Sequence, residues 1–178
     1  MRRSPAASGN QFTYWQSPIG WIGIVAGPIG LLEILIRADA TELKHLVEAN
    51  YPAATLTSDG ICAEAVTQLQ DYFSGRRRIF DLPVDLSDVT PFTRTVLEVL
   101  RQVRSGQTVS YGQLAVSAGR PGAARAVGRA MASNPLPIII PCHRVIGAGG
   151  ALTGYSGGAG LVTKQWLLQF EEELARDQ

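Results

Sequence analysis

Cysteine and histidine are scarce in this chain of 178 residues, which holds only Cys62, Cys142, His45 and His143. Two cysteines form one disulfide at most, so the sequence does not describe a small secreted domain held together by disulfides. A zinc site with four ligands would need every one of these side chains, and they lack the short paired spacing of such sites. We therefore expect no metal ion and no cofactor.

Long apolar runs are also missing. No segment approaches the roughly 20 apolar residues that a helix needs to cross a bilayer. The first ten residues, MRRSPAASGN, carry two arginines without the apolar stretch of a secretory signal. We expect residues 1–10 to be flexible and the protein to be cytoplasmic, with no membrane partner. Hydrophobic residues make up 46% of the chain, which is enough to build a core.

Acidic residues are nearly absent from the middle of the chain, although the net charge is only +1. Residues 91–145 hold seven arginines and one acid, whereas residues 1–90 hold seven basic and ten acidic side chains. An arginine-rich segment of this kind is typical of a surface that binds phosphate groups. Charge alone leaves a second interpretation open, namely a solvated surface without a partner.

The first half of the chain predicts a small antiparallel sheet followed by helices. Three strand-like segments, 12–16, 21–26 and 31–37, are separated by SPIG and GPIG, whose proline and glycine favour turns. Residues 40–49 and 61–75 have helical spacing, and Gly75 stands where a helix would end. An extended linker then reaches a domain boundary near residue 88, so we expect an N-terminal domain over residues 11–88.

The second half of the chain contains residues that are typical of helix N-termini. Thr90 and Pro91 predict a helix N-terminus, and Ser110 with Gln113 predicts a capping box. The helix that follows Ser110 ends near Gly119, and the turn RPG leads to another helix over residues 123–134. Two short helices joined by a glycine-containing turn have the outline of a helix-turn-helix, although many small domains contain such a pair.

The helix over residues 123–134 has two different faces. Val127 and Met131 lie one turn apart and predict its core face, whereas Arg125 and Arg129 point outward. The surface between them is made of small residues: Ala126, Gly128, Ala130 and Ala132. A glycine inside a helix costs about 1 kcal/mol relative to alanine, which indicates a close approach there. The approaching body is either a narrow groove of nucleic acid or another helix.

The segment IIIPCHRVIG, residues 138–147, places Cys142 beside His143 and Arg144. We expect its isoleucines, 138–140, to form a buried strand. A buried cysteine is often only a small apolar residue, but His143 offers a base and Arg144 a positive charge that would favour a thiolate. Neighbouring side chains on regular structure point apart, so His143 would act on the thiol either through a bridging water or from a turn that Pro141 forces the two residues to share. Its other nitrogen needs an acceptor, for which the chain offers Glu171, Glu172 and Glu173.

Residues 134–147, NPLPIIIPCHRVIG, resemble the active-site signature of the O6-alkylguanine-DNA alkyltransferases, the methylated-DNA–protein-cysteine methyltransferases. SYGQLA and GAARAVGRAMASNP resemble the two helices of that family's helix-turn-helix. TPFTRTVLEVL, TGYSGG and KQWLLQFE resemble its domain start, substrate loop and last helix, in the family's order. The resemblance covers residues 90 to about 172 closely, and SPIG with FDLPVDL extends it to the N-terminal half.

The resemblance implies a mixed α/β (α+β) fold. Residues 11–88 would form a ribonuclease-H-like domain with a small antiparallel sheet, and residues 89–175 a mostly helical domain of winged helix-turn-helix type. The implied function is direct reversal of DNA damage: irreversible transfer of an alkyl group from O6-alkylguanine, and also from O4-alkylthymine, to Cys142. The implied partner is double-stranded DNA containing O6-alkylguanine, bound in the minor groove by a monomer, with cooperative assembly left open. Some relatives bind zinc in the N-terminal half, but this chain lacks the ligands.

The resemblance also implies roles for single residues. Cys142 would accept the alkyl group, His143 would take the thiol proton through water, Glu171 would orient His143, and Tyr111 would donate a proton to the departing guanine. Asn134 would brace the turn before the active site, and the base pocket would include Val145, Tyr155 and Ser156. The DNA-binding residues would be Ala124, Arg125, Ala126, Gly128 and Arg129, with Arg125 replacing the base that is flipped out of the duplex.

Two other functions compete with alkyl transfer. A lesion-binding sensor would flip and hold the base without transfer, but in such relatives the cysteine is replaced, whereas Cys142 is present here. A Cys-His hydrolase would need an orienting Asp or Asn and an oxyanion hole, and the sequence signals neither. Alkyl transfer is therefore the function that we expect.

Overall fold

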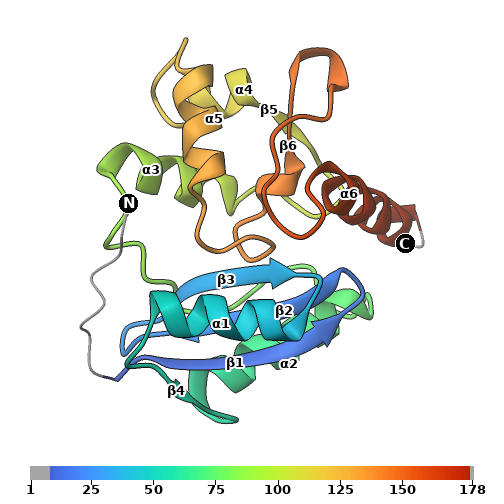
Figure 1. Cartoon of the computed structure of the whole chain (residues 1–178). Helices are drawn as coiled ribbons and strands as arrows, with labels where there is room; N and C mark the ends of the chain where they lie inside the picture. Colours follow the sequence, from blue (N-terminus) through green and yellow to red (C-terminus); the bar gives the residue numbers. More distant parts are fainter. Residues whose placement is uncertain (1–8, 177–178) are drawn as a thin grey trace. The chain divides into compact units, whose positions relative to one another are not determined.

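The computed structural model describes residues 9–176, and the chain divides between Asp88 and Val89 into two compact units (Figure 1). Of the segment 1–10 that was expected to be flexible, residues 1–8 lie outside the described part. Asn10 is buried, and its carbonyl oxygen accepts a hydrogen bond from the Thr55 nitrogen at 3.0 Å. Asn10 is thus tied to the first sheet, and the flexibility of residues 1–10 stays a prediction.

The N-terminal unit is built on a four-stranded sheet. Strands β1 (Gln11–Ser17), β2 (Gly20–Ala26) and β3 (Leu31–Arg37) form the predicted antiparallel meander, joined by short turns. The two-residue strand β4 (Thr55–Leu56) pairs in parallel with β1, which gives the order β3-β2-β1-β4. The sequence did not predict β4, because two residues are too few to show an alternating pattern.

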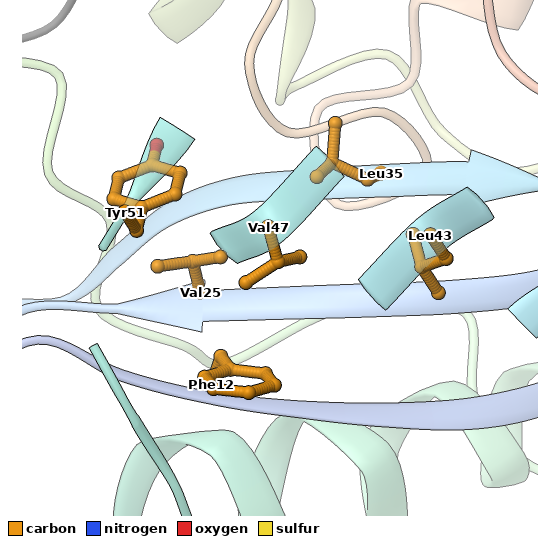
Figure 2. Packing of buried hydrophobic residues seen from close by; sticks show 6 residues of the cluster. All are labelled: Phe12, Val25, Leu35, Leu43, Val47 and Tyr51. Atoms are coloured by element: carbon orange, nitrogen blue, oxygen red, sulfur yellow. The ribbon is translucent and has the colours of Figure 1, made fainter. Parts of the chain in front are cut away.

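Helix α1 (Ala40–Asn50) covers one face of this sheet. Figure 2 shows the side chains that pack between them: Phe12, Val25 and Leu35 from the strands, with Leu43, Val47 and Tyr51 from the α1 segment. A Cβ atom on Gly23 would lie 2.9 Å from the Leu43 Cδ1 atom, so this glycine allows the helix to approach the sheet closely.

Helix α2 (Gly60–Phe73) packs on the other face. Trp15 points to the opposite side of β1 from Phe12, and its ring contacts Phe73 of α2 with a centroid distance of 5.9 Å. The helix ends as predicted, because Gly75 has φ +78° and its nitrogen donates to the Tyr72 carbonyl. Cys62 is fully buried in this helix.

The C-terminal unit is mostly helical. Its longer helices are α3 (Pro91–Leu100), α4 (Tyr111–Ser117), α5 (Ala124–Ala132) and α6 (Leu161–Arg176). Strands β5 (Val109–Ser110) and β6 (Val145–Ile146) pair in parallel, and the 3₁₀ turns η1 (Cys142–Arg144) and η2 (Ala148–Gly150) flank β6. None of the helices described over residues 9–176 is long and apolar enough to cross a membrane.

The predicted helix starts are confirmed by their caps. The Thr90 hydroxyl accepts from the Thr93 nitrogen at 3.2 Å, with Pro91 at the first helical position. Ser110 and Gln113 form the reciprocal capping box. Helices α4 and α5 make the predicted helix-turn-helix. The last helix starts at Leu161, three residues before the predicted segment that begins at Lys164. The mixed α/β fold class is confirmed, with a sheet in the first unit and mainly helices in the second.

The predicted strand over residues 138–140 is wrong, because these isoleucines form a buried turn. Pro135, Pro137 and Pro141 surround them, and proline lacks the N–H that a strand ladder requires. The Ile140 nitrogen instead donates to the Leu136 carbonyl at 2.8 Å. Ile138 has φ 74°, a backbone conformation that costs a β-branched residue about 1–3 kcal/mol and persists only under firm surrounding contacts.

Candidate active site

Cys142 opens the single turn η1 directly after the buried isoleucine turn. Its side chain is 6% exposed, and the thiol is free. A 3₁₀ turn has about three residues per turn, so consecutive side chains point in directions about 120° apart. His143 is therefore directed away from the thiol and toward α6. The geometry agrees with the expectation that the two groups do not meet directly.

Asn134 braces the turn that leads to Cys142. Its Nδ2 donates to the Ile140 carbonyl at 2.8 Å, and its Oδ1 accepts from the Leu136 nitrogen at 3.1 Å. These two bonds close the turn that holds Ile138 at positive φ. The predicted bracing position of Asn134 thus corresponds to the observed geometry, although the turn does not lead to a strand.

His143 is fully buried and binds Glu171 of α6, with 3.0 Å between Nε2 and Oε1. Glu171 is 1% exposed, whereas Glu172 and Glu173 are exposed to solvent. Of the three glutamates that the sequence offered as acceptors for His143, Glu171 is therefore the one that binds it. The other ring nitrogen of His143, Nδ1, is buried and makes no hydrogen bond within the described part of the chain. A neutral imidazole whose Nε2 hydrogen is held by Glu171 carries an accepting lone pair on Nδ1.

Arg144 binds the same carboxylate. Its Nε donates to Glu171 Oε2 at 2.9 Å and its Nη2 to Oε1 at 2.7 Å, while Nη1 donates to the Val103 carbonyl at 2.6 Å. The Gly106 nitrogen also donates to Glu171 Oε2 at 3.2 Å. The expectation that the Arg144 charge favours the thiolate is therefore corrected, because a guanidinium in bidentate contact with Glu171 is directed at that carboxylate.

Burial and pairing set the charges of this network. Burial alone would raise the pKa of Glu171, but hydrogen bonds and charges from His143 and Arg144 outweigh it and hold that pKa below its usual range. Burial lowers the pKa of His143, although Glu171 opposes the shift. Burial also raises the pKa of the Cys142 thiol, against the hydrogen bond from Asn134. The resting site therefore contains a neutral thiol, a neutral imidazole and a carboxylate paired with Arg144.

Lys164 is a residue of this site that the sequence reasoning missed. It is fully buried on the first turn of α6, and its Nζ donates to the Val145 carbonyl at 2.5 Å and to the Thr153 carbonyl at 2.6 Å. Burial lowers the pKa of Lys164. A signal was present: Lys164, Leu167 and Glu171 follow the i, i+3, i+7 spacing of one helix face, and all three are buried.

The predicted proton donor and pocket residues come from three segments: the start of α4, strand β6 and the loop before α6. The Tyr111 hydroxyl, on the first residue of α4, donates to the Thr153 carbonyl at 3.2 Å. The Tyr155 hydroxyl is buried and makes no hydrogen bond with the described residues, and burial raises the pKa of Tyr155 well above its usual range. Val145 is buried beside η1. Ser156 lies exposed next to Tyr155, and no hydrogen bond joins its side chain to the rest of the described site.

Helix α5 carries the predicted DNA-binding residues. Arg125 and Arg129 are exposed, and neither pairs with an acidic side chain in the described part of the chain. Val127 and Met131 form the buried face, as predicted. Ala130 is 2% exposed, so its assignment to the outer surface is wrong: it lies three residues after Val127, on the packed face.

Gly128 decides between the two explanations for the small residues of α5. A Cβ atom added at Gly128 would meet only the Tyr111 ring, at an ordinary contact distance of 4.0 Å. Packing within the protein therefore does not require a glycine here. Ala124, Ala126 and Gly128 are partly exposed on α5 beside the two exposed arginines. This arrangement favours close approach by an external body such as a nucleic-acid groove.

Comparisons with known proteins match both units. Residues 11–86 match the ribonuclease-like domain of 6-O-methylguanine DNA methyltransferase, and residues 91–173 match its DNA binding domain. The methylated-DNA–protein-cysteine methyltransferase of Mycolicibacterium paratuberculosis is 45% identical over 150 residues, which cover 83% of this chain and 89% of the relative. The human protein of that name is 41% identical over 165 residues, 89% of this chain and 79% of its own length.

Solved protein structures also match this chain. The crystal structure described as Mycobacterium tuberculosis OGT in complex with DNA is 39% identical, with a TM-score of 0.74, and the match covers 92% of this chain and 94% of that chain. The structure of Mycobacterium tuberculosis O6-methylguanine methyltransferase has a TM-score of 0.76 at 38% identity, covering 92% and 93%. The family resemblance drawn from the sequence motifs is confirmed.

Proposed function

The chain belongs to the 6-O-methylguanine DNA methyltransferase family, and from this premise we propose how it acts on alkylated DNA. It is a methylated-DNA–protein-cysteine methyltransferase of DNA repair, and its macromolecular partner is DNA. In our proposal the substrate is O6-alkylguanine, and also O4-alkylthymine, in duplex DNA. Cys142 is the acceptor, and each protein molecule reacts once.

The observation that carries this proposal is the arrangement of Cys142, His143 and Glu171. Glu171 holds Nε2 of His143, and the opposite nitrogen, Nδ1, is buried and unpartnered beside the turn that begins with Cys142. A base oriented in this way can take the thiol proton through one bridging water. The neutral resting state of both groups supports a proton transfer that takes place only when a substrate is bound.

The proposed reaction breaks one bond and forms one bond at carbon. As the thiol proton moves to His143, a sulfur electron pair attacks the alkyl carbon, and the bond between that carbon and O6 breaks. Its electron pair remains on the purine, which takes a proton from the Tyr111 hydroxyl and leaves as neutral guanine. The product on Cys142 is a thioether, which has no easy route back to a thiol, so the protein is consumed.

Reaching O6 requires the base to leave the duplex, which costs a few kcal/mol. In our proposal α5 enters the minor groove, where its small residues permit close approach and Arg125 occupies the space left by the flipped nucleotide. The exposure of Arg125 and Arg129, and the open surface at Gly128, support this placement. Tyr155 and Ser156 would then line the pocket that receives the base.

Intact-mass measurement after mixing the protein with an O6-methylguanine duplex tests the proposal. We expect a gain of one methyl group on the peptide that contains Cys142, with one equivalent transferred per protein. Cys142→Ser should show no gain, whereas Cys62→Ser, which alters the other free cysteine, should react like the wild type. Binding without a mass gain would identify a lesion sensor, and repeated turnover would identify a hydrolase. Either result contradicts the proposal.

A further inference from the structure

We infer that Lys164 is a positioning residue of the alkyl-transfer site, where its ammonium group joins the acceptor turn to the substrate loop and stabilises the Cys142 thiolate. This inference rests on the proposed function, since the thiolate is the species that the proposed transfer requires. In this inference Lys164, and not Arg144, is the cation that stabilises the sulfur anion, because the charge of Arg144 is directed at Glu171.

The first support is the set of segments that Lys164 connects. The Val145 carbonyl follows directly after the turn that carries Cys142, and the Thr153 carbonyl belongs to the loop that carries Tyr155. The Thr153 carbonyl also accepts the Tyr111 hydroxyl at 3.2 Å. One ammonium group therefore fixes the acceptor turn and the substrate loop, and through a shared acceptor it fixes the residue proposed to protonate guanine.

The second support is the absence of an acidic partner. Lys164 is fully buried, yet no carboxylate within the described residues forms an ion pair with it. Two carbonyls occupy two of its three N–H donors, and its ammonium group makes no third hydrogen bond within the described part of the chain. A buried ammonium without an anion is costly to maintain. Retaining one beside a nucleophilic thiol is consistent with an anion that forms during the reaction.

The surrounding groups leave Lys164 as the net positive charge near the sulfur. The groups that act on Cys142 are the charge of Lys164 on α6, the neutral amide of Asn134 and the backbone of its own turn, while the ring of Tyr155 on the loop feels the sulfur charge. The His143 side chain on that turn is directed at Glu171. Beyond His143, the charges of Arg144 and Glu171 cancel in their bidentate pair. Burial raises the pKa of Cys142, and the charge of Lys164 opposes that shift. Lys164 moves no proton in the reaction; it lowers the energy of the charged sulfur.

Substitution of Lys164 separates its charge from its packing. In a Cys62→Ser background, where Cys142 is the only thiol, the rate of alkylation by iodoacetamide is measured against pH. Lys164→Met should move the pH profile to higher values, and one pH unit corresponds to a rate about tenfold lower below the thiol pKa. Lys164→Arg keeps the charge and should keep the profile. Lys44→Met alters the only other lysine, which is exposed, and is the matched control. An unchanged profile in Lys164→Met would overturn the inference.

A second measurement needs no substitution of Lys164, so loss of folding in Lys164→Met leaves the inference testable. The chain has two lysines, and isotope labelling of lysine gives one NMR signal for Lys164 and one for Lys44. The Lys164 signal should shift at the pH at which Cys142 ionises, and this step should disappear in Cys142→Ser. A Lys164 signal indifferent to Cys142 ionisation would contradict the inference.

Both measurements are independent of DNA. Failure of the wild type to take a methyl group from the O6-methylguanine duplex would refute the proposed function alone. If the wild type does take the group, Lys164→Met should slow transfer at saturating DNA while leaving DNA affinity unchanged, and Lys164→Arg should restore part of the rate. A lysine that only filled space would leave the pH profile of the thiol unchanged.

Discussion

Replacing Glu171 by glutamine tests the buried charge network. The substitution keeps the size of the side chain but removes the anion that faces Arg144, which is 4% exposed. Removing one partner of a buried ion pair typically costs about 3–5 kcal/mol, because the remaining charge stays buried without compensation. We therefore expect the free energy of unfolding, measured by urea denaturation and circular dichroism, to fall by about 3–5 kcal/mol in Glu171→Gln.

The pH dependence gives this prediction a sign. The pKa of Glu171 is depressed in the folded state, so its stabilising contribution is complete above the ordinary value of 4.5 and is lost as the pH falls below it. The difference in stability between wild type and Glu171→Gln should therefore stay constant from neutral pH down to about 5.5 and shrink at lower pH. Repair should slow at every pH at which the variant folds, because a neutral amide oxygen accepts from His143 more weakly than a carboxylate and does not stabilise the imidazolium.

Two controls sharpen the test. Glu172→Gln removes an exposed glutamate paired with Arg176 on the same helix, and it should change stability by less than about 1 kcal/mol. Combining Glu171→Gln with Arg144→Met removes the stranded cation and should recover much of the lost stability. A loss below about 1 kcal/mol in Glu171→Gln, or a stability gap that persists unchanged in acid, would refute the reasoning.

Two further predictions concern the outer surface of α5. Arg125→Ala should slow repair more in duplex than in single-stranded substrate, whereas Arg129→Ala, the matched exposed arginine one turn away, should weaken both to a similar and smaller degree; equal losses in Arg125→Ala would contradict the base-replacing role. Gly128→Leu should leave the free energy of unfolding within about 1 kcal/mol of wild type, because a Cβ atom there makes only an ordinary contact with the Tyr111 ring. The variant should nevertheless weaken binding to duplex DNA, as measured by fluorescence anisotropy. Wild-type affinity in a folded Gly128→Leu would exclude close approach at this position.

Local signals in the sequence explain how much of the fold could be predicted. The three strands were predictable because SPIG and GPIG separate their apolar segments, and the helix starts because Thr90 and Ser110 cap them. The isoleucine turn was mistaken for a strand because three consecutive apolar residues resemble a buried strand. The surrounding prolines were the contrary signal, since they deny the ladder its donors.

The contacts that complete the site join residues too far apart in sequence for spacing to reveal. Glu171 and His143 are separated by 28 positions, and Arg144 reaches the Val103 carbonyl across 41. The motif order identified the nucleophile and the base through family resemblance. The partner of Arg144 depends on how α6 and the loop before β5 meet in three dimensions. A prediction from charge alone therefore assigned Arg144 to the thiol and not to Glu171.

Helix α6 explains how a neutral resting site can still produce a thiolate. Lys164 and Glu171 lie seven residues apart on one buried face, about 10 Å along the axis, with Leu167 between them. Proton transfer from Cys142 to His143 would create an anion facing Lys164 and a cation facing Glu171. The new anion therefore meets the charge of Lys164, and the imidazolium keeps its existing hydrogen bond to Glu171, so no reorganisation of the protein is needed. The buried ammonium of Lys164 has no acidic partner among the described residues at rest, which is unfavourable, but its charge becomes favourable when the sulfur ionises. Helix α6 therefore links the stability of the fold to its chemistry.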